Sequence, residues 1–353
     1  MPWRKPVERL RTVALIALLI ALVPVRVTEG ETQSAAPPSV PYLDEAARAG
    51  AEFKRLHSLL VSWRGDVILE RYYNGRQATS LANIKSASKS VISALVGIAI
   101  DRGHIRSVKE PIGGFFTDVL AGEKNAAKRR ITVQDLLTMQ SGLETTSNRN
   151  YGSWVLSRNW VHHALNRPIT SEPGTQMVYS TGNTHLLSAI LTRTTGKSTW
   201  QFAQDVFAKP LGFSLARWPQ DPQGVYFGGN DMLMTPRQML AFGELYLRRG
   251  KFENRQIVTA DWIDASFTPH AQSNRERERQ YGYGWWIRDL GGQRTYYAWG
   301  YGGQFIFLIP NLDLVVVTTS SSEVSGERRT HLGTIFDLVE NLIIQPIAAV
   351  ADR

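Results

Sequence analysis

The first hydrophobic pattern is a pair of strand-like runs. Residues 59–73 (LLVSWRGDVILERYY) hold two runs rich in β-branched, aliphatic and aromatic residues on either side of Arg64-Gly65-Asp66. A glycine between such runs supplies the positive φ that a tight turn needs. The pattern predicts a β-hairpin over these residues.

A continuous apolar segment follows. Residues 89–100 (KSVISALVGIAI) are almost all apolar or small. A helix that is apolar on every side is a buried helix, and Gly103 is placed to end it. From there to about Gly250 the pattern indicates short helices and loops, one of which opens at residues 131–137 with Thr132 as its N-cap.

The last third of the chain returns to strands. Short β-branched or aromatic runs are separated by Gly-Gly or Pro-Asn pairs, and they cover residues 283–288, 295–299, 305–309 and 314–319. This spacing is typical of an antiparallel meander, and a helix over about 330–348 closes the chain.

These elements predict an α+β fold. Strands at both chain ends imply an antiparallel sheet built from distant sequence and flanked by helices, with a mostly helical domain inserted. We assign residues 51–85 and 245–353 to the sheet domain and residues 86–244 to the helical domain.

The N-terminal pattern is typical of an export signal over residues 1–30. An apolar run at 13–23 ends at Pro24 and is shorter than the ~20 residues that span a bilayer. Residues 31–50 are predicted as a linker. We therefore expect an exported protein, periplasmic or secreted, without an integral membrane span in the mature chain. The alternative is a leader that is retained as an anchor. The basic residues before the apolar run are Arg4, Lys5, Arg9 and Arg11.

The charge pattern and the cysteine and histidine content bear on whether the protein binds nucleic acid or a metal ion. The net charge is +9 over 353 residues, but the basic clusters at 128–130 and 275–279 are short or alternate in sign, as in solvated loops. We expect no nucleic-acid partner. The chain has no cysteine, and His162-His163 lacks the spacing of a zinc motif. No metal and no cofactor are predicted.

Candidate chemistry begins with Ser86 and Lys89. Residues three apart share a helix face, so the hydroxyl and the amine can meet. A lysine can take a proton from serine only if its pKa is lowered, and the apolar segment after Lys89 offers the burial that lowers it. The alternative is a solvated helix start with Ser86 or Ser88 as N-cap.

Two later segments complete the candidate site. Tyr179 could move protons between the nucleophile and a leaving group, because a nearby ammonium helps a phenol to ionise. The small residues within 298–304 (AWGYGGQ) would let a substrate approach the backbone, whose N–H groups can stabilise an oxyanion. Alone, the first segment is more typical of a core tyrosine, and the second is more typical of a β-turn with an aromatic strand.

The order of the motifs adds a resemblance. Ser86-x-x-Lys89, then 132–143 (TVQDLLTMQSGL), then 173–180 (PGTQMVYS) resembles the serine β-lactamase/DD-peptidase superfamily over roughly residues 55–345. Within it, the chain is most similar to class C β-lactamase-like esterases and 6-aminohexanoate-dimer hydrolases.

This resemblance implies the same α+β fold and a serine hydrolase that cleaves a small amide or ester through an acyl-enzyme. It implies Ser86 as nucleophile, Lys89 and Tyr179 as base and acid, and the backbone N–H groups of Ser86 and Tyr301 as the oxyanion hole. The implied substrate-binding residues are Trp299, Gly300, Asn183 and Thr181.

Two departures limit the resemblance. Thr181 stands where the family has an asparagine, for which Asn183 could compensate, and the third segment has no Lys-Thr-Gly. Without that lysine the sequence favours a neutral or amino-terminated substrate over a penicillin-like anion. A β-lactamase or DD-peptidase, and a non-catalytic protein that binds a peptide or cell-wall fragment, stay as alternatives.

Overall fold

The computed structural model describes residues 43–274 and 276–351, which form one compact unit. Its centre is an eight-stranded antiparallel sheet in the order β2-β1-β12-β11-β10-β9-β8-β7. The predicted export signal at residues 1–30 lies outside the described residues. The strands of the sheet, in spatial order, are Asp66–Tyr72, Leu56–Trp63, Leu314–Ser320, Gln304–Ile309, Gln293–Gly300, Trp286–Leu290, Gln280–Tyr281 and Ala271–Gln272.

The predicted hairpin is confirmed. Strand β1 pairs with β2 so that Trp63 faces Asp66, and Arg64 and Gly65 form the turn with φ of 53° and 88°. Two consecutive positive φ values match the twist of the flanking strands. The other side of β1 pairs with β12, so strands from the two chain ends lie side by side, as the sequence predicts.

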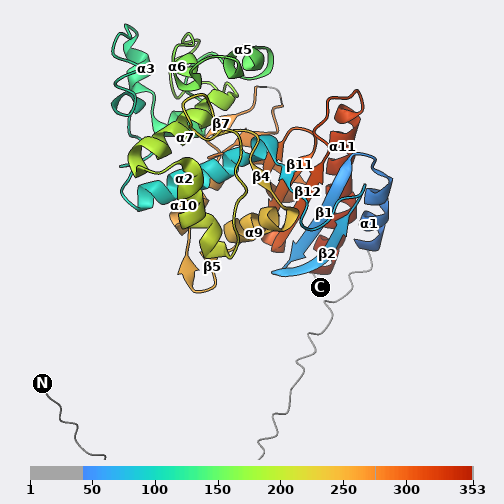
Figure 1. Ribbon diagram of the computed structural model, residues 1–353. Coiled ribbons are helices and arrows are strands. Elements are labelled where there is room, and N and C mark those ends of the chain that lie inside the picture. Colours follow the sequence, from blue (N-terminus) through green and yellow to red (C-terminus); the bar gives the residue numbers. More distant parts are fainter. Residues whose placement is uncertain (1–42, 275, 352–353) are drawn as a thin grey trace, which may run out of the picture. The chain divides into compact units, whose positions relative to one another are not determined.

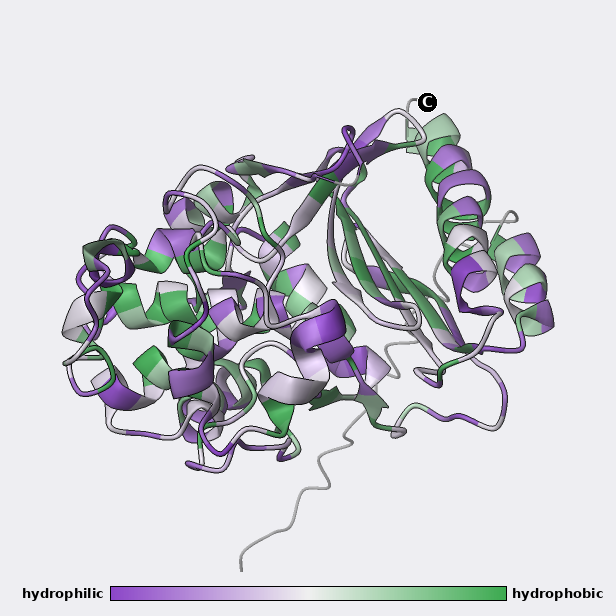
Figure 2. Ribbon diagram, turned by 90° about the horizontal axis from the view of Figure 1, so that it is seen from above, coloured by the Kyte–Doolittle hydropathy of each residue, from purple (hydrophilic) through white to green (hydrophobic). Residues whose placement is uncertain are grey.

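Helices cover both faces of the sheet (Figure 1). Alternate residues of β11 enter two different cores: Ile306 packs with α2 and α9, whereas Phe307 packs with α1 and α11. Figure 2 shows the central strands as largely hydrophobic. The helices are α1 (Leu43–Glu52), α2 (Ser88–Asp101), α3 (Ala126–Arg130), α4 (Val133–Leu137), α5 (Tyr151–Val155), α6 (Trp160–Leu165), α7 (Thr181–Thr195), α8 (Thr199–Ala203), α9 (Pro236–Leu247), α10 (Ala260–Phe267), α11 (Arg328–Val339) and α12 (Gln345–Ala351).

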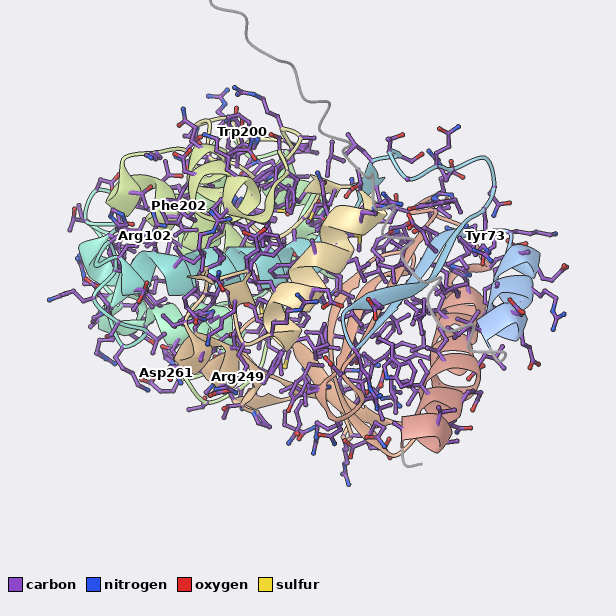
Figure 3. The ribbon with its side chains drawn as sticks, turned by 90° about the horizontal axis from the view of Figure 1, so that it is seen from below. Tyr73, Arg102, Trp200, Phe202, Arg249 and Asp261 are labelled. Atoms are coloured by element: carbon purple, nitrogen blue, oxygen red, sulfur yellow. The ribbon has the colours of Figure 1, made fainter. Side chains whose placement is uncertain are left out.

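Helix α1 corrects part of the predicted linker. Residues 43–50 belong to this helix, and Leu43 and Ala46 are buried in the core. The Tyr73 hydroxyl donates to the Ala47 carbonyl oxygen at 3.0 Å, and Figure 3 shows this tyrosine beside α1. The folded unit therefore begins before the predicted boundary at residue 51.

Helix α2 is the buried helix that the apolar segment predicts. All its residues from Ser88 to Ala99 are buried, and Gly103 follows its end with a φ of 74°. Most of the shorter helices lie around α2 (Figure 1). One of them, α4, begins at the predicted N-cap Thr132, whose side chain accepts from the Asp135 N–H.

The C-terminal elements differ from the prediction in detail. Strand β9 starts at Trp286, because Gly284 (φ 81°) turns the chain just before it. The last helix runs from Arg328 to Ala351 through a π-helical turn at Glu340–Ile344. By length and composition it could cross a membrane, but Ile335 and Ile344 are buried against the sheet, as in a core helix.

Four short strands lie outside the main sheet. Ala82–Asn83 (β3) pairs with Leu233–Met234 (β4), and Lys251–Phe252 (β5) pairs with Arg255–Gln256 (β6). The first pair matters for the site, because β3 leads directly into the turn before α2.

Candidate active site

Ser86 lies in a single 3₁₀ turn, Lys85–Ala87, between β3 and α2. Its side chain lines a cavity of about 320 Å³. The predicted alternative, that Ser86 or Ser88 caps the helix, is wrong: Ala87 holds the N-cap position and no side chain caps it. The hydroxyl is thus available at the cavity wall.

The turn that carries Ser86 is held in a strained conformation. Lys85 has a φ of 49°, a region that non-glycine residues adopt rarely and that recurs at functional sites. Its ammonium lies 2.7 Å from Asp231 Oδ1, and Asn83 Nδ2 donates to the same oxygen at 2.7 Å. The Lys85 N–H also donates to Asn83 Oδ1 at 3.0 Å. These contacts fix the nucleophile relative to β3 and to the Asp231 segment.

Lys89 meets the requirement for a base. It is 1% exposed, and burial lowers its pKa to about 7. The negative charge of Asp231 raises this pKa and so partly offsets the effect of burial. Its Nζ lies 3.1 Å from Ser86 Oγ and 3.3 Å from Thr181 Oγ1, and it donates to the Gly229 carbonyl oxygen. A neutral amine can donate to the carbonyl and to the threonine oxygen while its lone pair accepts from the serine hydroxyl.

Gly229 allows this contact. A Cβ at this position would lie 2.1 Å from Thr184 Oγ1 and 3.1 Å from Lys89 Nζ. The segment therefore reaches the lysine only as bare backbone. The carbonyl oxygen of Gly229 then anchors the amine in the direction of Ser86.

Tyr179 completes the group. Burial raises its pKa to about 12, although a hydrogen bond with Ser86 opposes the rise. Lys89 Nζ lies 5.1 Å from the centre of the phenol ring. The structure therefore brings Ser86, Lys89 and Tyr179 together. The expectation of a readily ionised phenol is not met, because burial desolvates the phenol and so disfavours the phenolate.

The third predicted segment lies beside the nucleophile turn. A Cβ at Gly300 would lie 2.1 Å from the Ile84 carbonyl oxygen, so the glycine allows β10 to pass this close. Trp299 and Tyr301 line the same cavity as Ser86. Gly300 itself is buried under the turn rather than placed in the cavity wall.

Thr181 and Asn183 do not line this cavity. Thr181 contacts Lys89 Nζ and lies 2.9 Å from Ser147 Oγ, which places it behind the lysine. Asn183 Oδ1 accepts from Ser141 Oγ at 3.0 Å in the buried interior. The hydroxyl at the family's asparagine position therefore orients the base, and Asn183 does not take over a place in the cavity wall.

Sequence reasoning missed much of the remaining wall. Arg279 was expected in a solvated loop, and this is wrong: it is 7% exposed and lies over the rings of Trp286 and Trp299. The alternating residues 275–279 contain no signal that separates this arginine from its neighbours. The further lining residues are Asn148, Met177, Ser273, Asn274, Glu276, Trp286 and Arg328.

Within residues 43–274 and 276–351, no group of three or more His, Cys, Asp and Glu side chains could hold a metal ion. The groups around Ser86 are an amine, a phenol and hydroxyls, which suit proton transfer to and from a serine nucleophile.

Comparison with known proteins decides the family. The family model described as "Beta-lactamase" matches residues 43–340. The chain belongs to the β-lactamase family. A curated relative, the 6-aminohexanoate-dimer hydrolase of Paenarthrobacter ureafaciens, is 23% identical over 291 residues, which is 76% of this chain and 73% of the relative.

Solved structures show the same β-lactamase-family fold. A Bacillus anthracis protein, provisionally named a 6-aminohexanoate-dimer hydrolase, superposes with a TM-score of 0.70 at 20% identity, over 88% of this chain and 82% of that one. EstCE1, a hydrolase with promiscuous acyltransferase activity, gives a TM-score of 0.68 at 16% identity, over 85% and 98%. With these relatives, this β-lactamase-family chain is a serine hydrolase of the amidase or esterase kind.

Proposed function

We propose that this hydrolase cleaves a small amide or ester through an acyl-enzyme on Ser86. The observation that carries the proposal is the contact of Ser86 Oγ with a buried lysine amine at 3.1 Å, with the pKa of that amine lowered to about 7. A base with a pKa near the working pH combines a useful neutral fraction with sufficient proton affinity.

The first half of the reaction forms the acyl-enzyme. Ser86 Oγ bonds to the substrate carbonyl carbon as its proton passes to Lys89 Nζ. The backbone N–H groups of Ser86 and Tyr301 are the donors that we assign to the oxyanion. The bond to the leaving nitrogen or oxygen then breaks as Tyr179 protonates that atom, and the phenolate takes back a proton from the Lys89 ammonium.

The second half releases the acid. A water molecule attacks the ester carbonyl and loses its proton to the same amine, and the Ser86 oxygen leaves and takes a proton back. Lys89 ends neutral, so the cycle consumes one water and needs no metal among the steps assigned here.

Replacing Ser86 tests the proposal. Ser86→Ala should reduce hydrolysis of p-nitrophenyl acetate by at least about 10³-fold, because the nucleophile is gone. Mass spectrometry of the wild type with a fluorophosphonate should show one adduct, on Ser86. Ser88→Ala is the matched control, since Ser88 is buried beside the site and has no part in the chemistry. Turnover or labelling that survives Ser86→Ala contradicts the assignment.

A β-lactamase or DD-peptidase is the second candidate. The cavity holds Arg279 and Arg328, so cationic groups are present although the third segment has no lysine. Hydrolysis of nitrocefin with a kcat in the usual range of about 1–1000 per second would favour this candidate. The third candidate, a non-catalytic binding protein, requires that no adduct forms on Ser86.

We also propose that the hydrolase is exported. The support is the basic and apolar pattern of residues 1–30. N-terminal sequencing of the protein recovered outside the cytoplasm should show that this segment has been removed. An intact leader in the membrane fraction would indicate the anchored alternative.

A further inference from the structure

His185 and Asp221 form a fully buried polar pair that the proposed reaction does not use. Neither side chain has exposed surface, and His185 Nε2 lies 3.0 Å from Asp221 Oδ2. Neither residue lines the cavity that contains Ser86. Because buried polar groups are costly unless they are hydrogen-bonded, the contacts of this pair show what it holds in place.

The carboxylate of Asp221 organises the loop that precedes Gly228. Its Oδ1 accepts from the backbone N–H groups of Gln223 and Val225, each at 2.9 Å. The remaining oxygen, Oδ2, faces the histidine ring. An ionised carboxylate only accepts hydrogen bonds, so the ring nitrogen that it faces, His185 Nε2, carries a proton.

The other ring nitrogen of His185 faces a backbone donor. The Gly228 N–H donates to His185 Nδ1 at 3.4 Å, which requires a lone pair on this nitrogen. The two contacts together select the tautomer that has its proton on Nε2. Asp221 thus determines what the ring presents to Gly228.

Gly228 connects this pair to the base. A Cβ at Gly228 would lie 2.2 Å from the Thr184 carbonyl oxygen, so the glycine packs with bare backbone on helix α7. The next residue is Gly229, whose carbonyl oxygen accepts from Lys89 Nζ. A shift of the Gly228 amide would therefore move an acceptor of the amine.

We propose that His185 is a positioning residue for Lys89, and that Asp221 acts by selecting the tautomer of His185. The ring holds the Gly228 amide, and the adjoining Gly229 carbonyl then directs the amine toward the nucleophile. The inference rests on the proposed function, because it concerns the base of that reaction. His185 itself touches neither the cavity nor the reacting atoms.

The tautomer can be measured directly in the folded wild type. Long-range proton–nitrogen NMR spectra of protein with isotope-labelled histidine should show a proton on His185 Nε2 and none on Nδ1, with His185→Asn used to assign the signal. In Asp221→Asn the side-chain oxygen stays on the two backbone N–H groups, so the amide N–H faces Nε2 and the proton should move to Nδ1. A proton on Nδ1 in the wild type overturns the proposal.

Asp221→Asn should also change the kinetics with p-nitrophenyl acetate. Two donors then face each other at Gly228, and kcat/KM should fall by about 10- to 100-fold as the base is misplaced. The pH at which kcat/KM reaches half of its plateau should decrease, because the displaced carbonyl favoured the charged form of Lys89. The charge that acts on Lys89 is that of Asp231, which the substitution leaves in place. Loss of folded protein lowers the plateau without moving this midpoint, so an unmoved midpoint overturns the proposal.

Two substitutions of His185 separate its two contacts without changing the carboxylate. In His185→Asn the side-chain oxygen takes the place of Nδ1 and can accept from Gly228, so the midpoint should stay at its wild-type value. In His185→Gln the amide takes the place of Nε2 and can donate only to Asp221, so the midpoint should decrease. Equal or reversed midpoints overturn the proposal. His104→Asn, at an exposed histidine, is the control and should leave the profile unchanged.

The two proposals fail in different experiments. A proton on His185 Nδ1 together with normal Ser86-dependent hydrolysis removes the positioning role alone. Absence of Ser86-dependent hydrolysis removes the proposed function, whatever the tautomer of His185.

Discussion

At the scale of single residues, Lys89 combines two opposing requirements. It must be neutral to accept a proton, yet it must stay hydrogen-bonded in an interior where an amine without partners would be unfavourable. Burial supplies the first, and the Gly229 carbonyl with the Thr181 hydroxyl supplies the second. The pH dependence of the enzyme should therefore report on this one amine.

We expect kcat/KM to rise with pH and to reach half of its plateau near pH 7. The neutral form of Lys89 is the active base, and its fraction grows as the pH passes its pKa of about 7. Tyr179, with a pKa near 12, should stay protonated across this range. A profile measured with p-nitrophenyl acetate that is flat from about pH 5 to about pH 9 would contradict this assignment.

Asp231→Asn should move the rise of kcat/KM with pH, the acid limb of the profile, to lower pH. The Asp231 carboxylate raises the pKa of Lys89, so its removal lets the pKa fall further. The plateau should also fall, because Lys85 loses its ion pair and the Ser86 turn its anchor. The direction of the limb is the decisive reading: a shift to higher pH contradicts the electrostatic role. Asp264→Asn, at an exposed ion pair with Arg249, is the control and should leave the profile unchanged.

Catalytic residues that belong to recognisable sequence motifs could be predicted from the sequence. Residues whose role depends on tertiary packing could not. Ser86, Lys89 and Tyr179 follow motifs, and the structure brings them together. Arg279 sits in an alternating charged run, and only the folding of Trp286 and Trp299 around it makes it a buried cation. Contacts between β9, β10 and this loop are tertiary, so local pattern could not contain them.

At the scale of elements, the approach of β10 to the Ser86 turn is the critical contact. Gly300→Ala should reduce kcat by about 10²-fold, because a Cβ 2.1 Å from the Ile84 oxygen must push the strand and the turn apart. Circular dichroism should show the fold retained. Gly122→Ala, where a Cβ meets no atom within 4 Å, should leave kcat unchanged. Full activity of Gly300→Ala would mean that this spacing does not control the site.

Helices and strands could be predicted where the hydrophobic periodicity agrees with the turn and cap residues at their ends. The hairpin at Arg64-Gly65 and the cap at Thr132 are local features, and both are confirmed. Helix α1 was missed because it follows a polar, proline-rich stretch and is too short to show more than two or three core positions. The assignment of residues 86–244 to a separate helical domain stays a prediction.

At the scale of the whole molecule, α2 connects the helical region with the sheet. Ser90 Oγ donates to the Gly284 carbonyl oxygen at 2.6 Å, just before β9. Further along the helix, a Cβ at Gly97 would lie 2.4 Å from the Trp262 ring of α10. The position of the nucleophile thus depends on packing along the full length of α2.

Gly97→Ala should lower the free energy of unfolding by about 1–3 kcal/mol, because the added methyl group overpacks the contact with Trp262. Thermal unfolding followed by circular dichroism should show a lower Tm. Gly333→Ala in α11, where no atom lies within 4 Å of the added Cβ, should instead raise stability by roughly 0.5–1 kcal/mol through helix propensity. A Tm that rises in both variants would contradict the tight packing.

The pairing of β1 with β12 also determines when the protein can finish folding. Ser58 and Thr319 share a 2.6 Å hydrogen bond across 261 positions of sequence. A ribosome that adds roughly 5–20 residues per second needs on the order of tens of seconds to make the intervening chain. Throughout that interval one side of the early hairpin stays open to other strands. In a nascent chain the sheet therefore cannot close until its last strand, β12, has emerged, and the unpaired edge of β1 is open to aggregation until then.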